Sequence, residues 1–158
     1  MSEILSADLW NTLLPLAANA HRRMAAVAYV TDVQTIPFGE GDTLVIDASD
    51  ACIRGGQTDA KSLAALFERG VKLWSCQNLH AKIYVFDSTV IVGSANLSHA
   101  SRNALTEAAM LSTEPTAVET ALSLIRSIAS KSVEVDDAFV ARALEIPVEA
   151  MSAGSIPS

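Results

Sequence analysis

The chain has 158 residues, half of them apolar and 18% charged, a composition that suits one globular domain with a sizeable core and excludes a disordered chain. Eighteen acidic residues against eleven basic ones leave a net charge of −7. A general nucleic-acid binder carries a basic excess that contacts phosphates, so a nucleic-acid substrate would have to meet a local basic patch or be delivered by a partner.

The sequence shows no sign of a membrane span or an exported protein. No apolar run reaches the length of about 18 residues that a spanning helix needs. The first residues lack the basic and then apolar pattern of a secretory signal. The two cysteines, Cys52 and Cys76, do not form a disulfide framework. We therefore expect a cytoplasmic protein without stable membrane association.

The predicted elements begin with a helix over residues 9–24, where Leu9 and Leu13 recur at helical spacing. Two β-rich segments follow at residues 25–30 and 42–47, and a turn-like stretch rich in glycine lies between them.

A second helix is expected after the loop marked by Gly55 and Gly56, with Asp59 as its N-cap and Gly70 beyond its end. Strands are then predicted at residues 71–75, 80–86, 88–94 and 105–111, and helices at residues 117–130 and 135–144. This alternation argues for an α/β sandwich, with a mixed central β-sheet flanked by helices on both faces.

We expect one domain over residues 1–145, followed by a polar tail over residues 146–158. The tail leaves room for an additional DNA-recognition domain. The chain has no internal repeat, so each of its motifs is present once.

The predicted strand at residues 80–86 carries two polar residues among apolar ones. Side chains alternate along a strand, so His80 and Lys82 share one face with Tyr84 and Phe86. The opposite face is also apolar, which is typical of a central strand covered on both sides. A lysine buried there is costly unless an anion meets its ammonium group, and a phosphoryl group is one candidate.

The same argument applies to Glu107 in the predicted strand at residues 105–111, where it shares a face with Leu105, Ala109 and Leu111. A carboxylate in such surroundings needs a hydrogen-bond donor, and the Nδ1–H group of a histidine can supply one. Pairing with His80 would fix the tautomer of that histidine and leave its Nε2 atom free to attack an electrophile.

Between these two segments lies Gly-Ser-Ala-Asn, residues 93–96. Gly93 allows a close backbone approach, Ser94 offers a hydroxyl and Asn96 offers an amide donor. Together with Lys82, these groups could surround the oxygens of a phosphoryl transition state. A lone histidine on an apolar strand is usually a core residue, but this ordered set is hard to obtain by chance.

The stretch HAKIYVFDSTVIVGSANLS resembles the signature of the phospholipase D superfamily, in which His80, Lys82, Asp87, Gly93, Ser94 and Asn96 all find a place. One departure is that five residues separate Asp87 from Gly93, where the family pattern has six. Asp87 falls at a hairpin turn, so we expect a structural role for it, with Gly93 also supporting the site. Glu107 resembles the downstream acidic residue of the family that holds the histidine.

The resemblance implies a metal-independent phosphodiesterase without cofactors. In this family the histidine attacks phosphorus to form a phosphohistidine, and a histidine from a second motif protonates the leaving alcohol. Because this chain has one motif, the resemblance to bacterial single-motif nucleases implies a homodimer with its active site at the two-fold interface. DNA is the expected substrate, with His80, Lys82, Asn96 and Glu107 as catalytic residues and Ser94 as a further phosphate ligand.

Two other functions stay open: a lipid phosphodiesterase or phosphatidyltransferase of the same superfamily, and a non-catalytic dimerisation or binding module. Outside the motif, Arg54 is either a surface residue or a grip for a flanking phosphate. His99 lies in a polar loop just past the motif. Cys76 and His80 are spaced like half a zinc site, but no second half accompanies them, so we expect no metal.

Overall fold

In the computed structural model, which describes residues 1–149, eight strands form one sheet in the order β1-β7-β6-β5-β2-β3-β4-β8. The strands are β1 (Ser2–Leu5), β2 (Arg23–Val27), β3 (Thr43–Ile46), β4 (Lys72–Ser75), β5 (Lys82–Phe86), β6 (Thr89–Gly93), β7 (Ala109–Ser112) and β8 (Val133–Glu134). The helices are α1 (Leu9–Asn19), α2 (Asp50–Arg54), α3 (Ala60–Glu68), α4 (His99–Asn103), α5 (Pro115–Ser130) and α6 (Asp137–Glu145).

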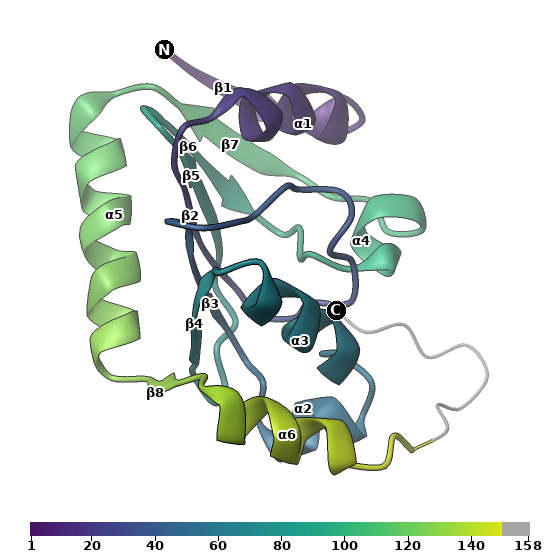
Figure 1. Cartoon of the computed structure of the whole chain (residues 1–158). Helices are drawn as coiled ribbons and strands as arrows, with labels where there is room; N and C mark the ends of the chain where they lie inside the picture. The colour runs from purple at the N-terminus through teal and green to yellow at the C-terminus, as the bar shows by residue number, and fades with distance from the viewer. Residues whose placement is uncertain (150–158) are drawn as a thin grey trace.

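The sheet is mixed, as predicted. Strands β2, β3 and β4 run parallel to one another, whereas β5 pairs antiparallel with β2 and continues through β6 and β7 in antiparallel pairs. Helices cover both faces (Figure 1). The predicted fold class is therefore confirmed.

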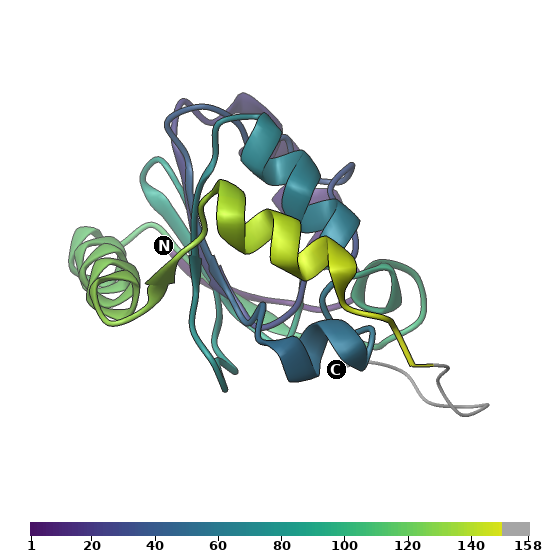
Figure 2. The same cartoon turned by 60° about the horizontal axis from the view of Figure 1, so that its bottom comes forward.

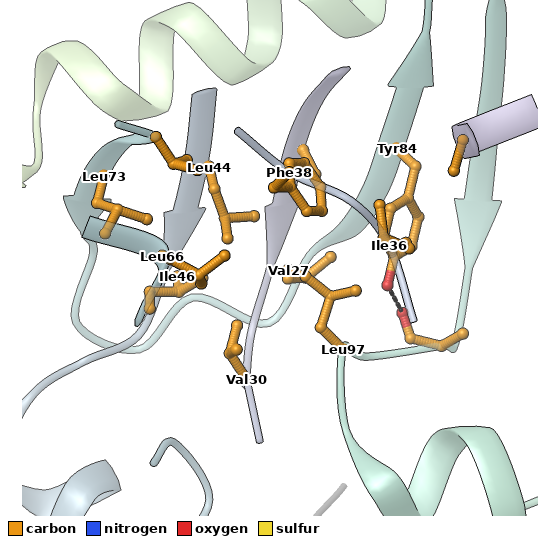
Figure 3. Packing of buried hydrophobic residues seen from close by; sticks show 14 of the residues in the cluster. Val27, Val30, Ile36, Phe38, Leu44, Ile46, Leu66, Leu73, Tyr84 and Leu97 are labelled. Atoms are coloured by element: carbon orange, nitrogen blue, oxygen red, sulfur yellow. Dashed lines mark hydrogen bonds between the residues drawn. The ribbon is translucent and has the colours of Figure 1, made fainter. Parts of the chain in front are cut away.

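Two apolar clusters lie on opposite faces of the sheet. On one face, α1, α3 and α6 pack over a cluster that includes Leu44 and Tyr84 (Figure 3). On the other face, α5 alone covers a smaller cluster around Ile83 and Val85. Because all five residues of β5 are buried, the prediction of a central strand covered on both sides is confirmed.

The helix signals in the sequence act as expected. Asp59 caps α3 by accepting a hydrogen bond from the backbone N–H of Ser62 at 3.0 Å, and Gly70 follows the helix with a φ of 85°. Asp136 caps α6 in the same way, through the N–H of Phe139 at 2.9 Å.

The first helix is shorter than the predicted range of residues 9–24: α1 ends at Asn19, and β2 begins at Arg23. Between these positions the backbone leaves the helix, and its N–H groups donate to two carboxylates that are distant in the sequence. Asp87 accepts hydrogen bonds from the backbone N–H groups of His21 and Arg22, and Asp42 accepts one from that of Arg23. Tertiary contacts thus override a local apolar period that would continue the helix.

Two predicted strands begin later than expected, and this changes the position of both candidate catalytic groups. Strand β5 starts at Lys82, so His80 lies in the segment before it. Strand β7 starts at Ala109, so Glu107 also precedes its strand. The predicted strand bounds were therefore wrong at these two positions, but the side chains of His80 and Lys82 still meet, with Nε2 and Nζ 3.1 Å apart.

Short elements were missing from the prediction: β1, α2, α4 and β8. Each spans five residues or fewer, too short for an apolar period to be recognised. Within residues 1–149, no helix is both long and apolar enough to cross a bilayer. The predicted tail over residues 146–158 lies mostly outside the described residues.

Candidate active site

The sheet topology brings the motif residues to one end of the molecule. Lys82 at the start of β5 is paired with Val27 at the end of β2, and its neighbour Ile83 is paired with Val92 near the end of β6. Gly93, the last residue of β6, is paired with Ala109 at the start of β7. The segments just outside these strand ends carry His80, Ser94, Asn96 and Glu107, so all of them gather at this end of the sheet.

Lys82 is almost fully buried, with 8% of its surface exposed, while His80 is exposed. The Nζ atom of Lys82 lies 3.1 Å from Nε2 of His80. Burial lowers the pKa of Lys82, and the nearby Glu107 carboxylate opposes this shift. Among residues 1–149, no carboxylate forms an ion pair with Lys82.

Glu107 is buried, with 7% of its surface exposed. Its carboxylate accepts hydrogen bonds from the hydroxyl of Ser94 at 2.5 Å and from that of Ser101 at 3.5 Å. The predicted hydrogen bond from His80 to Glu107 does not form within the described part of the chain, where His80 contacts Lys82 instead. Glu107 acts on the site through the two serine hydroxyls and through its charge.

Asn96 is completely buried and holds the backbone of the site together. Its Oδ1 atom accepts a hydrogen bond from the N–H of Tyr29 at 3.2 Å, and its own backbone N–H donates to the hydroxyl of Ser101 at 3.0 Å. The Nδ2 group has no partner among residues 1–149. A buried donor without an acceptor is costly, so this amide is suited to an acceptor that arrives with a ligand.

Ser101 was not identified from the sequence. Its hydroxyl accepts from Asn96 and donates to Glu107, so it links two of the predicted site residues. The only local signal is the N-cap of α4, where the hydroxyl of Ser98 accepts from the N–H of Ser101 at 3.1 Å.

Gly93 is required by the packing of two strands. A Cβ atom at this position would lie 2.3 Å from the carbonyl oxygen of Ala108 and 2.5 Å from Cβ of Ala109. Any side chain would therefore separate β6 from β7 and displace Ser94, the next residue.

Asp87 lies at the far end of β5 from Lys82, so the fold does not bring it to the site. It occupies the turn between β5 and β6 with a φ of 51°. Its carboxylate accepts from the backbone N–H groups of His21 and Arg22, and these hydrogen bonds lower its pKa. This geometry gives Asp87 a structural task, the attachment of the β5–β6 hairpin to the start of β2.

The remaining candidates lie around the site. His99 is exposed at the start of α4, and its backbone N–H donates to the hydroxyl of Thr31. Arg54 is exposed at the end of α2. Within residues 1–149, no group of three or more histidine, cysteine, aspartate or glutamate side chains is placed to hold a metal ion.

Residues 10–128 match the family described as cardiolipin synthase, PLD-like domain. The matched range contains every motif residue discussed above. No curated protein matches the chain at the sequence level.

The fold is also similar to solved structures. NucT from Helicobacter pylori superposes with a TM-score of 0.69 at 14% identity, over 85% of this chain and 99% of that protein. The phospholipase D family member Nuc from Salmonella typhimurium gives a TM-score of 0.64 at 17% identity, over 87% and 99% of the two chains. Phosphatidylserine synthase from Haemophilus influenzae Rd KW20 gives 0.59 at 12% identity, over 85% of this chain and 39% of that one.

Proposed function

The chain belongs to the phospholipase D-like family, and from this we propose that it is a phosphodiesterase in which His80 forms a transient covalent bond to phosphorus. The observation that carries the proposal is a pair of donors on buried residues, of which, within residues 1–149, one has no hydrogen-bond partner and the other contacts only a histidine. The ammonium of Lys82 and the Nδ2 group of Asn96 both belong to segments at the same end of the sheet, and within residues 1–149 neither meets a carboxylate. A bound phosphoryl group would supply acceptors for both.

The chemistry begins with Nε2 of His80. The ammonium group of Lys82 can only donate a hydrogen bond, so Nε2 of His80 must accept it with a lone pair. In a neutral His80 the ring proton then lies on Nδ1. When a phosphodiester takes the place of this contact, Nε2 attacks phosphorus, the P–N bond forms and the bond to the leaving oxygen breaks. Water then attacks phosphorus and gives a proton to a second imidazole, which has by then protonated the leaving oxygen; the P–N bond breaks, and His80 is regenerated.

The leaving oxygen needs a proton that His80 of the same chain cannot supply while it attacks. A second copy of the chain would provide it from its own His80 in the protonated imidazolium form, so the proposed active enzyme is a homodimer with its site at the two-fold interface. An apolar groove of about 490 Å³ between α5 and the sheet offers a surface for this second copy. Ile83 is part of its lining, and so are Val92 and Met110, which are 46% and 50% exposed.

A nucleic acid, and DNA in particular, is the proposed substrate, because the single-motif chain resembles bacterial nucleases and shares almost the whole length of NucT and Nuc. A lipid diester is the second candidate. The family description and the fold similarity to a phosphatidylserine synthase favour it.

Incubation of the chain with supercoiled plasmid and excess EDTA tests the proposal. Nicking is expected in the wild-type protein, with a loss of at least about 10⁴-fold in His80→Ala. His80 is exposed, so the variant should fold with an unchanged Tm, and His99→Ala is a matched control for an exposed histidine near the site.

Reactions with ³²P-labelled substrate, stopped with SDS at alkaline pH because the P–N bond of phosphohistidine hydrolyses in acid, should yield a phosphoprotein that is lost in His80→Ala. Release of headgroup from phosphatidylcholine vesicles without plasmid nicking would move the substrate to lipids. A chain that cleaves neither substrate and traps no phosphohistidine would be a binding module, and the proposal would be wrong.

A further inference from the structure

A polar pocket of about 430 Å³ lies between α1 and α4 and reaches the buried Glu107. Arg102 lines this pocket, with its guanidinium 5.7 Å from the centre of the Trp10 ring. The indole N–H of Trp10 donates to the backbone carbonyl of Ser101 at 3.2 Å. This hydrogen bond holds Trp10 beside Ser101, whose hydroxyl contacts Glu107. The Trp10 ring in turn makes a cation–π contact with Arg102.

A second pocket, of about 520 Å³, lies between α2, α6 and the end of β4. Figure 2 shows α2 and α6 side by side on this part of the molecule. Arg54 and Arg142 both line the pocket, together with Asp50. The guanidinium of Arg142 lies 5.0 Å from the centre of the Phe139 ring. Gln77, three residues before His80, is also part of the lining.

The sheet order places these two pockets on opposite sides of β5. The first pocket is lined by residues just before β7, which is two strands from β5 in one direction. The second is lined by residues just after β3, which is two strands from β5 in the other direction. Neighbouring strands lie about 4.8 Å apart, so β7 and β3, which lead to the two pockets, each lie roughly 10 Å from β5 across the sheet.

The three arginines have no acidic partner in the described part of the chain. Among residues 1–149, Arg23 forms an ion pair with Asp42, but none of Arg54, Arg102 and Arg142 pairs with a carboxylate. In a chain with a net charge of −7, three unpaired guanidinium groups beside the site form the local basic surface that an anionic substrate needs.

We infer that the substrate is an extended polyanion whose phosphates bind on both sides of the scissile one, to Arg102 in the first pocket and to Arg54 and Arg142 in the second. This inference rests on the proposed phosphodiesterase function and deepens it. The phosphates of one strand of a duplex are spaced about 3.4 Å along the helix axis, so on a duplex each arginine pocket corresponds to a phosphate about three nucleotides from the cleaved bond. A phospholipid with a single phosphodiester, such as phosphatidylcholine, has no such flanking phosphates.

The test compares two substrates, a 20-nucleotide oligonucleotide and the small diester bis(4-nitrophenyl) phosphate. The variants are Arg102→Gln and the double variant Arg54→Gln/Arg142→Gln. Arg126→Gln is the matched control, because Arg126 is exposed on α5, which covers the opposite face of the sheet. The ratio of kcat/KM for the oligonucleotide to kcat/KM for the small diester should fall at least about tenfold in both test variants and stay at the wild-type value in the control.

The salt dependence gives a second readout. The slope of log KM against log salt for the oligonucleotide should become shallower by about 0.7 to 0.9 for each phosphate contact removed. Ratios and slopes equal to those of Arg126→Gln would overturn the inference, as would equal losses on both substrates. If the wild-type chain cleaves neither substrate, the proposed function fails. Oligonucleotide binding measured by fluorescence anisotropy would still decide the inference, because weaker binding is expected only in the test variants.

Discussion

At the scale of single residues, the site consists of polar groups whose burial is costly in the free chain. Burial lowers the pKa of Lys82, and the Nδ2 group of Asn96 has no partner within residues 1–149. The charge of Glu107 partly offsets the cost at Lys82. Burying the Lys82 ammonium and the Asn96 amide lowers the stability of the folded chain when no ligand is bound. A ligand that brings hydrogen-bond acceptors for both groups explains why they are there.

Glu107→Gln should move the pH dependence of the enzyme in a defined direction. The variant keeps a hydrogen-bond acceptor for Ser94 but removes the negative charge that raises the pKa of Lys82. The pKa of Lys82 should therefore fall further, and the alkaline limb of the pH–rate profile should shift to lower pH, with kcat reduced about a hundredfold.

The profile of kcat/KM from pH 5 to 10 checks this prediction. Glu119→Gln, at an exposed position on α5, should leave the profile unchanged. An alkaline limb that stays in place in Glu107→Gln would show that Lys82 does not feel this charge.

At the scale of elements, the site depends on how closely β6 and β7 approach and on how the β5–β6 hairpin is attached. Gly93 permits the close approach of β6 and β7, because it has no side chain. Asp87 attaches the β5–β6 hairpin through its hydrogen bonds to the backbone of His21 and Arg22. Neither residue needs to touch a substrate for its replacement to be felt at the site.

Gly93→Ala should destabilise the protein by about 3 kcal/mol, because the new methyl group would overlap the backbone of β7. Activity should fall with it, since Ser94 is displaced. Gly39→Ala is the matched control, because no atom lies within 4 Å of its added Cβ. Urea denaturation of both variants measures the difference, and equal midpoints would contradict the steric argument.

Asp87→Asn should lower the stability at neutral pH but not in acid. The folded-state pKa of Asp87 is depressed, so its contribution is present above the ordinary aspartate pKa of about 3.9 and is lost as the pH falls through the folded-state value. Because the carboxylate is exposed, the loss in Tm at pH 7 should be only about 2 °C.

Thermal melting from pH 7 down to pH 2.5 tests this prediction: the wild-type and variant curves should converge at the acid end. A constant gap across this range would mean that the charge of Asp87 is not responsible. Activity at neutral pH should be retained, since Asp87 lies at the opposite end of β5 from Lys82.

At the scale of the whole molecule, the proposed two-histidine scheme makes catalysis depend on association, because each chain has one motif. The proposed contact surface is the apolar groove that contains Val92 and Met110. Strand β1 extends this apolar surface beyond the groove, because Ile4 is paired with Met110 and is 68% exposed.

Met110→Asp should convert a dimer into a monomer and abolish activity, because a charge in an apolar interface must be desolvated without a partner. Leu144→Asp is the control, since Leu144 on α6 is also 50% exposed but lies on another helix, outside the groove. Analytical ultracentrifugation and diester hydrolysis measure both effects. A monomeric wild-type chain with full activity would contradict the two-histidine scheme.

Local patterns in the sequence were sufficient for much of this description. Apolar periods and N-caps predicted α3, α5 and α6, and the run of apolar residues around Lys82 predicted a buried central strand. These features depend on residues within a few positions of one another. The ordered motif likewise indicated the family, and the family match over residues 10–128 supports that interpretation.

Tertiary structure decided which groups meet. The amide of Asn96 holds Tyr29 across 67 positions, and Glu107 accepts from Ser94 and Ser101 although His80 was expected to be its donor. The arginines of the two pockets come from α2, α4 and α6, and the strand order places the strands that lead to these pockets on either side of β5. Periodicity and capping act within one element, whereas these contacts depend on strand register and on the packing of distant segments, so the amino-acid order alone did not reveal them.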